Sequence, residues 1–253
     1  EIAQCLVGSE MCIRDRLRCR MKIVNQRELG NLLNECPNSV NSACELAYAE
    51  SQSRRERNSQ LILEAFLEKY RDKLSDVEKA KVYTNLAFYY SDEENIKEYN
   101  YLSAAVKLKS PYIETYRGLA LYHFSAYREK GSVEELKKSL HTFEKGTTVS
   151  DDYEMNFGYA VCLFELKEYE KAKTTFEELL KDYPNRMRLL LSIAYCDVYL
   201  GYKDQAMNRL KQIKLGQDEQ YKDKYYDSDI IHDFQVYEAY YVSVSYTHLR
   251  AHE

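Results

Sequence analysis

Twelve positions in the C-terminal half of the chain form six pairs, and the two members of each pair differ in residue number by the same amount, 34. The earlier members of these pairs are Tyr159, Ala160, Leu166, Tyr169, Ala172 and Phe176. Their later counterparts are Ile193, Ala194, Leu200, Lys203, Ala206 and Leu210. A fixed period of this length, with small residues at two points and large apolar residues around them, is typical of repeated helix-turn-helix units. Such a unit buries its apolar face only by stacking on a neighbour, so the pattern predicts an all-α solenoid.

Small residues also mark the first helix of each expected repeat. Alignment on these residues places Ala87, Ala120, Ala160 and Ala194 at successive spacings of 33, 40 and 34. We explain the long step by extra residues over 128–132, where Gly131 ends one helix and Ser132 caps the next. The second helices are centred on 99–106, 136–146, 172–179 and 206–213, and prolines stand near two repeat ends, at Pro111 and Pro184.

The pattern resembles the tetratricopeptide repeat. It is strong over 152–215 and fair over 112–151, but weak over 79–111, where Tyr99 occupies the place of the second small residue. The resemblance implies a right-handed α-solenoid that binds other proteins, with repeats over 79–111, 112–151, 152–185 and 186–215.

Helices are also expected on both sides of the repeats. Residues 41–51 and 58–73 form a plausible pair within an N-terminal region of 17–78, with Leu46 and Ala47 facing Leu63, Phe66 and Leu67. A linker and a further helix, near 229–241, are predicted within 216–243. Because end repeats normally carry a polar cap, a chain cut here exposes Ile230, Phe234 and Tyr237 and favours self-association.

The two termini resemble translated sequencing adapter. Residues 6–16 and 244–253 read as translations of opposite strands of one DNA segment, so we exclude 1–16 and 244–253 from the fold prediction. We therefore expect a fragment of a longer protein, whose true start, including any signal peptide, lies outside this sequence.

Charge and residue composition bear on whether the protein binds nucleic acid, spans a membrane or works in a reducing compartment. The net charge is -5 with both signs interspersed, which argues against a nucleic-acid-binding surface, and no apolar run reaches the length of a membrane span. Outside the adapter-like ends, the cysteines have no disulfide or zinc spacing; they are Cys19, Cys36, Cys44, Cys162 and Cys196. These observations favour a reducing compartment and a cytoplasmic protein.

The first helices supply the candidate binding groove, because in tetratricopeptide-repeat proteins they line the concave face. One aligned column is small: Asn85, Gly118, Gly158 and Ser192. The flanking candidates are Phe88, Arg117, Leu121, Phe124, Phe157, Val161, Phe164, Leu191, Tyr195, Val198 and Tyr199. Glycine in a helix lowers helix stability by about 1 kcal/mol relative to alanine, so the presence of two glycines at the same repeat position calls for an explanation. That reason is either close approach of a bound peptide or tight packing between helices.

No enzyme chemistry is indicated. The sequence has no phosphate-binding glycine loop, nucleophile elbow or paired zinc motif, so we expect no enzyme and no cofactor. His123 and His141 could be considered as metal ligands, but His123 occupies the repeat's bulky wedge position and fits a core or interface histidine better. Cys162 and Cys196 fit buried free thiols better than a disulfide. The charged runs 54–57 and 92–94 fit solvated turns, and Arg117 and Arg188 do not reproduce the carboxylate clamp of some family members.

Three functional classes are compatible with these observations. The first is a scaffold that binds a peptide or protein segment in its groove. The second is a peptide sensor that controls an output domain, and the third is the accessory region of an enzyme. Fold alone does not choose among them, because function depends on particular sites on the scaffold.

Overall fold

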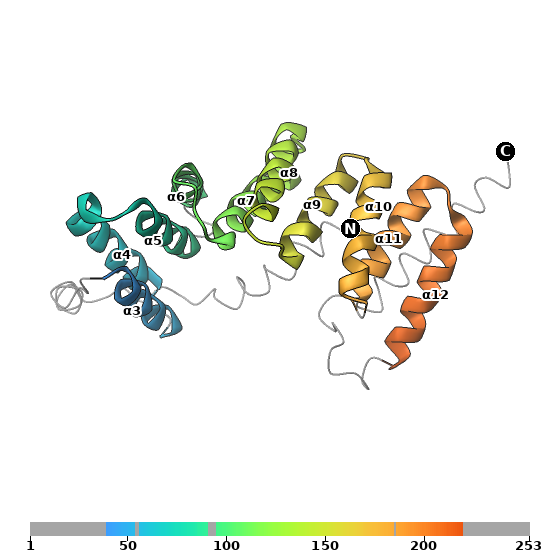
Figure 1. The fold of residues 1–253 in the computed structure, drawn as a ribbon, viewed down its shortest axis with the longest axis horizontal. Helices are drawn as coiled ribbons and strands as arrows, with labels where there is room; N and C mark the ends of the chain where they lie inside the picture. Colours follow the sequence, from blue (N-terminus) through green and yellow to red (C-terminus); the bar gives the residue numbers. More distant parts are fainter. Residues whose placement is uncertain (1–38, 54–55, 91–94, 185, 220–253) are drawn as a thin grey trace. The chain divides into compact units, whose positions relative to one another are not determined.

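The computed structural model describes residues 39–53, 56–90, 95–184 and 186–219, and every regular element in these ranges is helical (Figure 1). The helices are α3 (Val40–Gln52), α4 (Glu56–Tyr70), a short 3-10 helix η1 (Arg71–Lys73), α5 (Asp76–Tyr89), α6 (Asn95–Lys107), α7 (Ile113–Lys130), α8 (Val133–Thr147), α9 (Tyr153–Glu165), α10 (Tyr169–Asp182), α11 (Met187–Leu200) and α12 (Lys203–Glu219). The predicted all-α class of stacked helix-turn-helix pairs is confirmed.

Local capping residues explain where several helices begin and end. Ser75 and Glu78 form a reciprocal capping box at the start of α5. Gly131 ends α7 in the left-handed conformation, with φ of 67°, and the Ser132 hydroxyl accepts a hydrogen bond from the Glu135 amide at the start of α8. The predicted stop and cap at this turn are therefore confirmed.

The chain divides into two compact units at Ser150/Asp151. In the N-terminal unit, consecutive helices from α3 to α8 pack against each other. First helices of neighbouring pairs also touch, because α5 contacts both α3 and α7. These contacts between successive helices are expected of a repeat stack in which each hairpin buries its apolar face on its neighbours.

The predicted N-terminal helix pair is confirmed as α3 and α4. Ala47, Leu63 and Phe66 are fully buried, and Leu67 is nearly so. Leu46 is partly buried and packs against the same core cluster, which also takes in residues of α5 and α6. The pair therefore contributes to a common core with the first predicted repeat.

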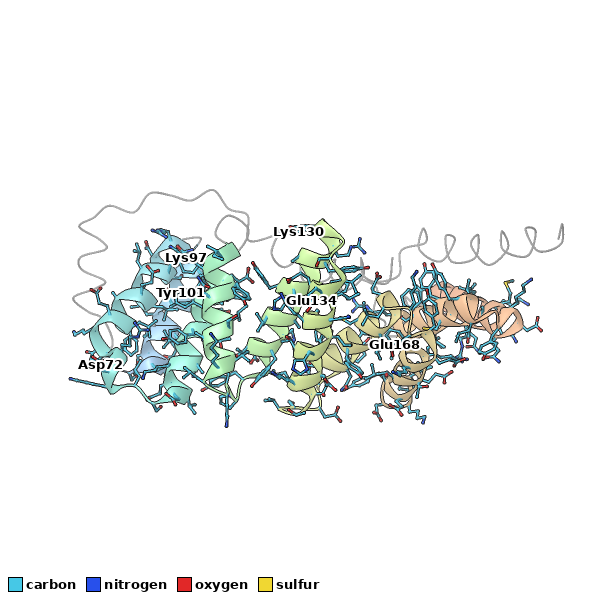
Figure 2. The ribbon with its side chains drawn as sticks, turned by 90° about the horizontal axis from the view of Figure 1, so that it is seen from above. Asp72, Lys97, Tyr101, Lys130, Glu134 and Glu168 are labelled. Atoms are coloured by element: carbon cyan, nitrogen blue, oxygen red, sulfur yellow. The ribbon has the colours of Figure 1, made fainter. Side chains whose placement is uncertain are left out.

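Aromatic side chains fill the space between α5 and α6. Figure 2 labels Lys97 and Tyr101, which project from successive turns of α6. The Tyr101 ring stacks on Tyr90, with centroids 5.8 Å apart, and the Lys97 ammonium lies 4.7 Å from the Tyr90 ring centroid. The Tyr90 hydroxyl donates to Glu64 of α4, and burial raises the pKa of Tyr90.

In the C-terminal unit, α9 packs on α10, α10 on α11, and α11 on α12. Seven of the twelve residues that define the repeat period are buried: Ala160, Ala172, Phe176, Ile193, Ala194, Ala206 and Leu210. The other five are half-buried or, for Lys203, exposed. Asp152 caps α9 by accepting hydrogen bonds from the amides of Glu154 and Met155. These seven positions therefore contribute to the packing between the helices.

Some predictions fall on residues that the structure does not describe. These are the adapter-like ends 1–16 and 244–253, the segment 17–38, and the helix expected near 229–241 with its exposed apolar residues. At the C-terminal end of the described chain, α12 continues to Glu219, past the limit of 215 expected for the last repeat.

Candidate functional site

All the predicted groove residues lie on the first helices of successive pairs. Asn85 and Phe88 belong to α5, and residues 117–124 of the predicted set belong to α7. In the C-terminal unit, the set from 157 to 164 lies on α9 and the set from 191 to 199 lies on α11. We describe the two units separately.

In the N-terminal unit, the predicted residues differ widely in exposure. Phe88 is 59% exposed, whereas Phe124 is fully buried. Arg117, Leu121 and Asn85 are half-buried. The Asn85 amide nitrogen donates to the Lys81 carbonyl within α5 at 2.9 Å, so its donor serves its own helix. Phe88 is therefore the predicted residue of this unit that is most available to a partner.

Gly118 favours helix packing over close approach of a ligand. A Cβ atom at this position would lie 3.1 Å and 3.2 Å from the two methyl carbons of Leu102 in α6. Leu102 is itself 3% exposed and packs in a cluster with Ala87 and Leu119. A glycine at residue 118 lets α6 and α7 approach closely, which is sufficient to explain its place in the helix.

In the C-terminal unit, most of the predicted residues are buried. The buried set is Phe157, Gly158, Val161, Leu191, Ser192 and Tyr195. Phe157 packs on the rings of Tyr153 and Phe176, with centroids 5.7 Å and 5.4 Å away. The buried side chains therefore belong to the packing of α9 and α11. The other three residues of the predicted set are more exposed: Phe164, Val198 and Tyr199.

Two of these predicted residues meet in an aromatic cluster, defined here as Phe164, Tyr169 and Tyr199. The rings of Tyr169 and Tyr199 stack at 4.8 Å with an interplanar angle of 16°. Phe164 meets both edge-on, at 5.2 Å and 5.4 Å. Tyr199 remains 54% exposed, and Phe164 and Tyr169 are half-buried. The cluster thus joins α9, α10 and α11 and presents an aromatic surface.

Tyr169 belongs to the cluster but was absent from the predicted groove set. It was identified only as a repeat position, because the prediction placed the groove on first helices and Tyr169 begins a second helix. The sequence did contain a signal for Tyr169. It follows Phe164 closely, so a tight turn between the two helices can bring the two rings together.

A charged network lies between α10, α11 and α12. Asp197 of α11 is fully buried, and its Oδ2 accepts a hydrogen bond from Arg209 Nε of α12 at 2.9 Å. Lys173 Nζ of α10 lies 2.7 Å from Asp197 Oδ1 without hydrogen-bond geometry, so this contact is an ion pair. Arg209 also donates to Glu177 at 2.8 Å. The network therefore links these three helices through side chains.

The other candidate chemical residues have structural partners. His123 is 7% exposed, and its Nδ1 lies 2.6 Å from Glu135 Oε2, as expected of a core histidine. Hydrogen bonds from Lys138 and then His123 hold the pKa of Glu135 below its usual value. His141 is exposed beside Glu144. Within the described ranges, no group of His, Cys, Asp and Glu side chains could hold a metal ion.

The two aligned cysteines are buried free thiols, as predicted. Cys162 and Cys196 are both fully buried and form no disulfide. Burial, followed by the nearby Asp197 charge, raises the pKa of Cys196 to about 12, so it remains a protonated thiol at neutral pH. Among the charged runs, Arg57 is exposed and donates to Gln60, whereas 54–55 and 92–94 lie outside the described residues.

Comparisons with known proteins identify the repeat. A tetratricopeptide-repeat family model matches residues 155–186, which span α9 and α10. No curated protein sequence matches the chain. None of the described helices is both long enough and apolar enough to cross a bilayer.

Solved structures share the fold at low sequence identity. A structure of MamA protein is 14% identical, with a TM-score of 0.59 over 73% of this chain and 95% of that one. YrrB, described as a TPR protein with an unusual peptide-binding site, is 13% identical, with a TM-score of 0.60 over 76% and 93% of the two chains. TTC0263, a thermophilic TPR protein from Thermus thermophilus, is 13% identical, with a TM-score of 0.50 over 81% and 99%. At these identities the likeness concerns the fold alone.

Proposed function

Because this chain contains a tetratricopeptide repeat and has the fold of tetratricopeptide-repeat proteins, we propose that it is a non-catalytic scaffold that binds a peptide segment of another protein. Helical-repeat stacks expose extended surfaces assembled from many short helices, and their recognised role is to hold partner chains. The peptide-binding description of YrrB, a protein of similar fold, supports this assignment.

The observation that carries the proposal is the aromatic cluster of Phe164, Tyr169 and Tyr199, in which Tyr199 is exposed and the other two rings are half-buried. Aromatic residues dominate binding energies at interfaces, because they bury a large area and lose little conformational entropy. The three rings fix each other by stacking and edge-on contacts, so the surface is already ordered before a partner binds. Such preorganisation lowers the entropic cost of binding.

We assign the predicted groove residues two different roles. The exposed and half-buried members are the peptide-contacting residues of each unit: Asn85, Phe88, Arg117 and Leu121 in the N-terminal unit, and Phe164, Val198 and Tyr199 in the C-terminal unit. The buried members set the positions of these side chains: Phe124, Phe157, Gly158, Val161, Leu191, Ser192 and Tyr195. Gly118 belongs with the second group, because its neighbour is Leu102.

We further propose that the protein works in a reducing compartment, the cytoplasm, without a nucleic-acid partner. The free thiols of Cys162 and Cys196 support the compartment. The interspersed charges and net charge of -5 support a protein partner over a polyanion.

Peptide display against the full chain tests the proposal. We expect it to select peptides whose affinity falls by about 10-fold or more in Tyr199→Ser, since loss of an aromatic anchor costs about 1–2 kcal/mol or more. The matched control is Tyr48→Ser in α3, because Tyr48 is 59% exposed and Tyr199 54%. Failure to select any peptide would contradict the scaffold function, whereas equal losses in both variants would contradict the aromatic cluster as its site.

A further inference from the structure

A stacked pair of aromatic rings in the N-terminal unit carries a cation on its face. The rings of Tyr90 and Tyr101 stack with their centroids 5.8 Å apart, and the Lys97 ammonium lies 4.7 Å from the Tyr90 centroid (Figure 2). The face of an aromatic ring is electron-rich, so it attracts a cation that lies within about 6 Å of the centroid. The chain itself supplies the cation for this pair of rings.

A second stacked pair, in the C-terminal unit, carries two cations. The rings of Tyr153 and Phe157 in α9 stack with their centroids 5.7 Å apart. The guanidinium carbon of Arg186 lies 4.8 Å from the Tyr153 centroid, and that of Arg188 lies 5.1 Å from the Phe157 centroid. Stacked rings and cationic side chains are therefore combined in both units of this protein.

The aromatic cluster of Phe164, Tyr169 and Tyr199 contains a third stacked pair, and this pair has an exposed ring. Tyr169 and Tyr199 stack at 4.8 Å, and Phe164 meets both rings edge-on. Tyr199 is 54% exposed, whereas Tyr90 and Tyr153 in the other two pairs are 1% and 7% exposed. Because the neighbouring rings hold Tyr199 in one orientation, a side chain of another molecule meets an ordered aromatic surface there.

The charges around the cluster favour a positive ligand. Residues 164–171 carry three carboxylates and two lysines, and residues 199–205 carry one charge of each sign, which leaves an excess of one negative charge. Glu170 directly follows Tyr169 and is exposed. It accepts a hydrogen bond from the Tyr202 hydroxyl at 2.9 Å, and this neutral donor does not cancel the carboxylate charge. A cation at the cluster therefore has a carboxylate beside it.

We propose that Tyr199 binds a cationic side chain of the partner peptide, so that the scaffold recognises a basic segment. This inference rests on the proposed function. The positive group lies over the exposed Tyr199 ring, as Lys97 and Arg186 lie over rings of the other two stacked pairs, and Glu170 adds electrostatic attraction. Arginine fits this surface better than lysine, because its planar guanidinium stacks on a ring and also carries the charge.

Four synthetic octapeptide libraries that differ only in a fixed central residue test the proposal. The central residue is arginine, lysine, glutamine or citrulline, which is a neutral group of nearly the same shape as arginine, and the other positions are random uncharged residues. Each library is passed over the immobilised full chain, and the retained peptide is quantified by mass spectrometry. We expect about 5-fold more retention of the arginine library than of the citrulline library, as for one exposed cation–π contact beside a surface carboxylate.

Variants distinguish the Tyr199 ring from other sources of attraction. Tyr199→Phe keeps an aromatic face and should keep the ratio of arginine to citrulline retention, whereas Tyr199→Leu keeps only apolar bulk and should lower the ratio to about 2-fold or less. Glu170→Gln should lower the ratio by about half. Glu178→Gln removes another exposed carboxylate of the same helix and should leave the ratio unchanged.

The outcomes separate this inference from the proposed function. Equal retention of the arginine and citrulline libraries overturns the cation site and leaves the scaffold function standing. A ratio that survives Tyr199→Leu, or that falls equally in Glu170→Gln and Glu178→Gln, assigns the attraction to the net negative charge of the chain and also overturns the site. No retention of any library above blank resin overturns both.

Discussion

The two units of this protein satisfy their buried polar groups in different ways. In the N-terminal unit, serine hydroxyls of second helices donate to alanine carbonyls of first helices: Ser59 to Ala47 at 2.6 Å, and Ser139 to Ala120 at 2.8 Å. In the C-terminal unit, the corresponding second helices carry Ala172 and Ala206, and the buried Asp197 carboxylate contacts two cationic partners. At these aligned positions the first unit therefore has neutral hydrogen bonds that the second unit lacks, whereas the second unit has a buried carboxylate network.

The two units also differ in how regularly the repeat pattern appears in their sequences. The family model matches α9 and α10, where small apolar residues occupy the repeated positions. In the weakest repeat, Tyr99 replaces the second small residue, and its ring packs 5.2 Å from Tyr122 and 5.8 Å from His123. The position that carries a small residue in the regular repeats can therefore carry an aromatic side chain that packs on the first helix of the next pair.

Removal of the buried Asp197 carboxylate should cause the largest loss of stability among the variants that test this comparison. Asp197→Ala leaves Lys173 and Arg209 facing each other without a counter-charge, at side-chain exposures of 12% and 22%. We expect a loss of about 3 kcal/mol from the C-terminal unit, as for other broken buried ion pairs. Hydrogen exchange of the α10 to α12 amides, compared with those of α3 to α6, measures it.

Two controls sharpen this result. Glu177→Ala removes the more exposed end of the network and should cost less than about 1 kcal/mol. Ser139→Ala removes a neutral buried hydrogen bond in the other unit and should cost about 1 kcal/mol. If Asp197→Ala costs no more than Ser139→Ala, the contrast between ionic and neutral pairing has no energetic basis.

The loss of folding stability of the N-terminal unit at acidic pH should depend on Glu135. Hydrogen bonds from Lys138 and His123 lower the pKa of this carboxyl in the folded state, so the folded state binds its proton less readily than the unfolded state. The stabilisation is complete above the unfolded pKa of about 4.3 and is lost as pH falls through the lower folded value.

Urea unfolding followed between neutral and acidic pH checks this prediction. Glu135→Gln should flatten the acidic limb of the stability profile for α7 and α8, by less than about 1 kcal/mol, because Lys138 is half exposed. A limb of unchanged steepness in Glu135→Gln would assign the pH dependence to other carboxyls.

The smallest expected effect concerns two turns of the C-terminal unit that occupy the same repeat position. Lys167 and Gly201, one repeat period apart, both adopt left-handed backbone, with φ of 65° and 81°. Lysine incurs a steric cost there that glycine does not, although glycine loses more entropy on folding. Lys167→Gly should therefore stabilise by about 0.5 kcal/mol, and Gly201→Ala should destabilise by a similar amount.

Chemical denaturation of both variants tests the equivalence of these turns. Shifts of opposite sign are expected. Shifts of the same sign would show that the two turns, despite equal backbone conformation, differ in what their side chains contribute.

The candidate site was only partly predictable. The alignment assigned Phe164 and Tyr199 to one rim of the expected groove, and their rings lie 5.4 Å apart, because Tyr199 directly follows Val198, the counterpart of Phe164 in the next repeat. It did not distinguish Phe88, which is exposed, from Phe124, which is buried, because both are apolar residues of first helices. It rejected Arg188 as part of a clamp, and nothing in its sequence neighbourhood indicated that its side chain would be buried over Phe157.

What the sequence determined by itself was the helical class and the position of several helix ends. Caps such as Ser132 and stops such as Gly131 act through hydrogen bonds and backbone angles within a few positions of the chain, so their effects can be read locally. What only the tertiary structure decided was which side chains share a buried contact. Gly118 packs against Leu102, and Asp197 joins Lys173 and Arg209, because separate helices of the chain come together there. Burial and charge pairing depend on those encounters, which no local pattern specifies.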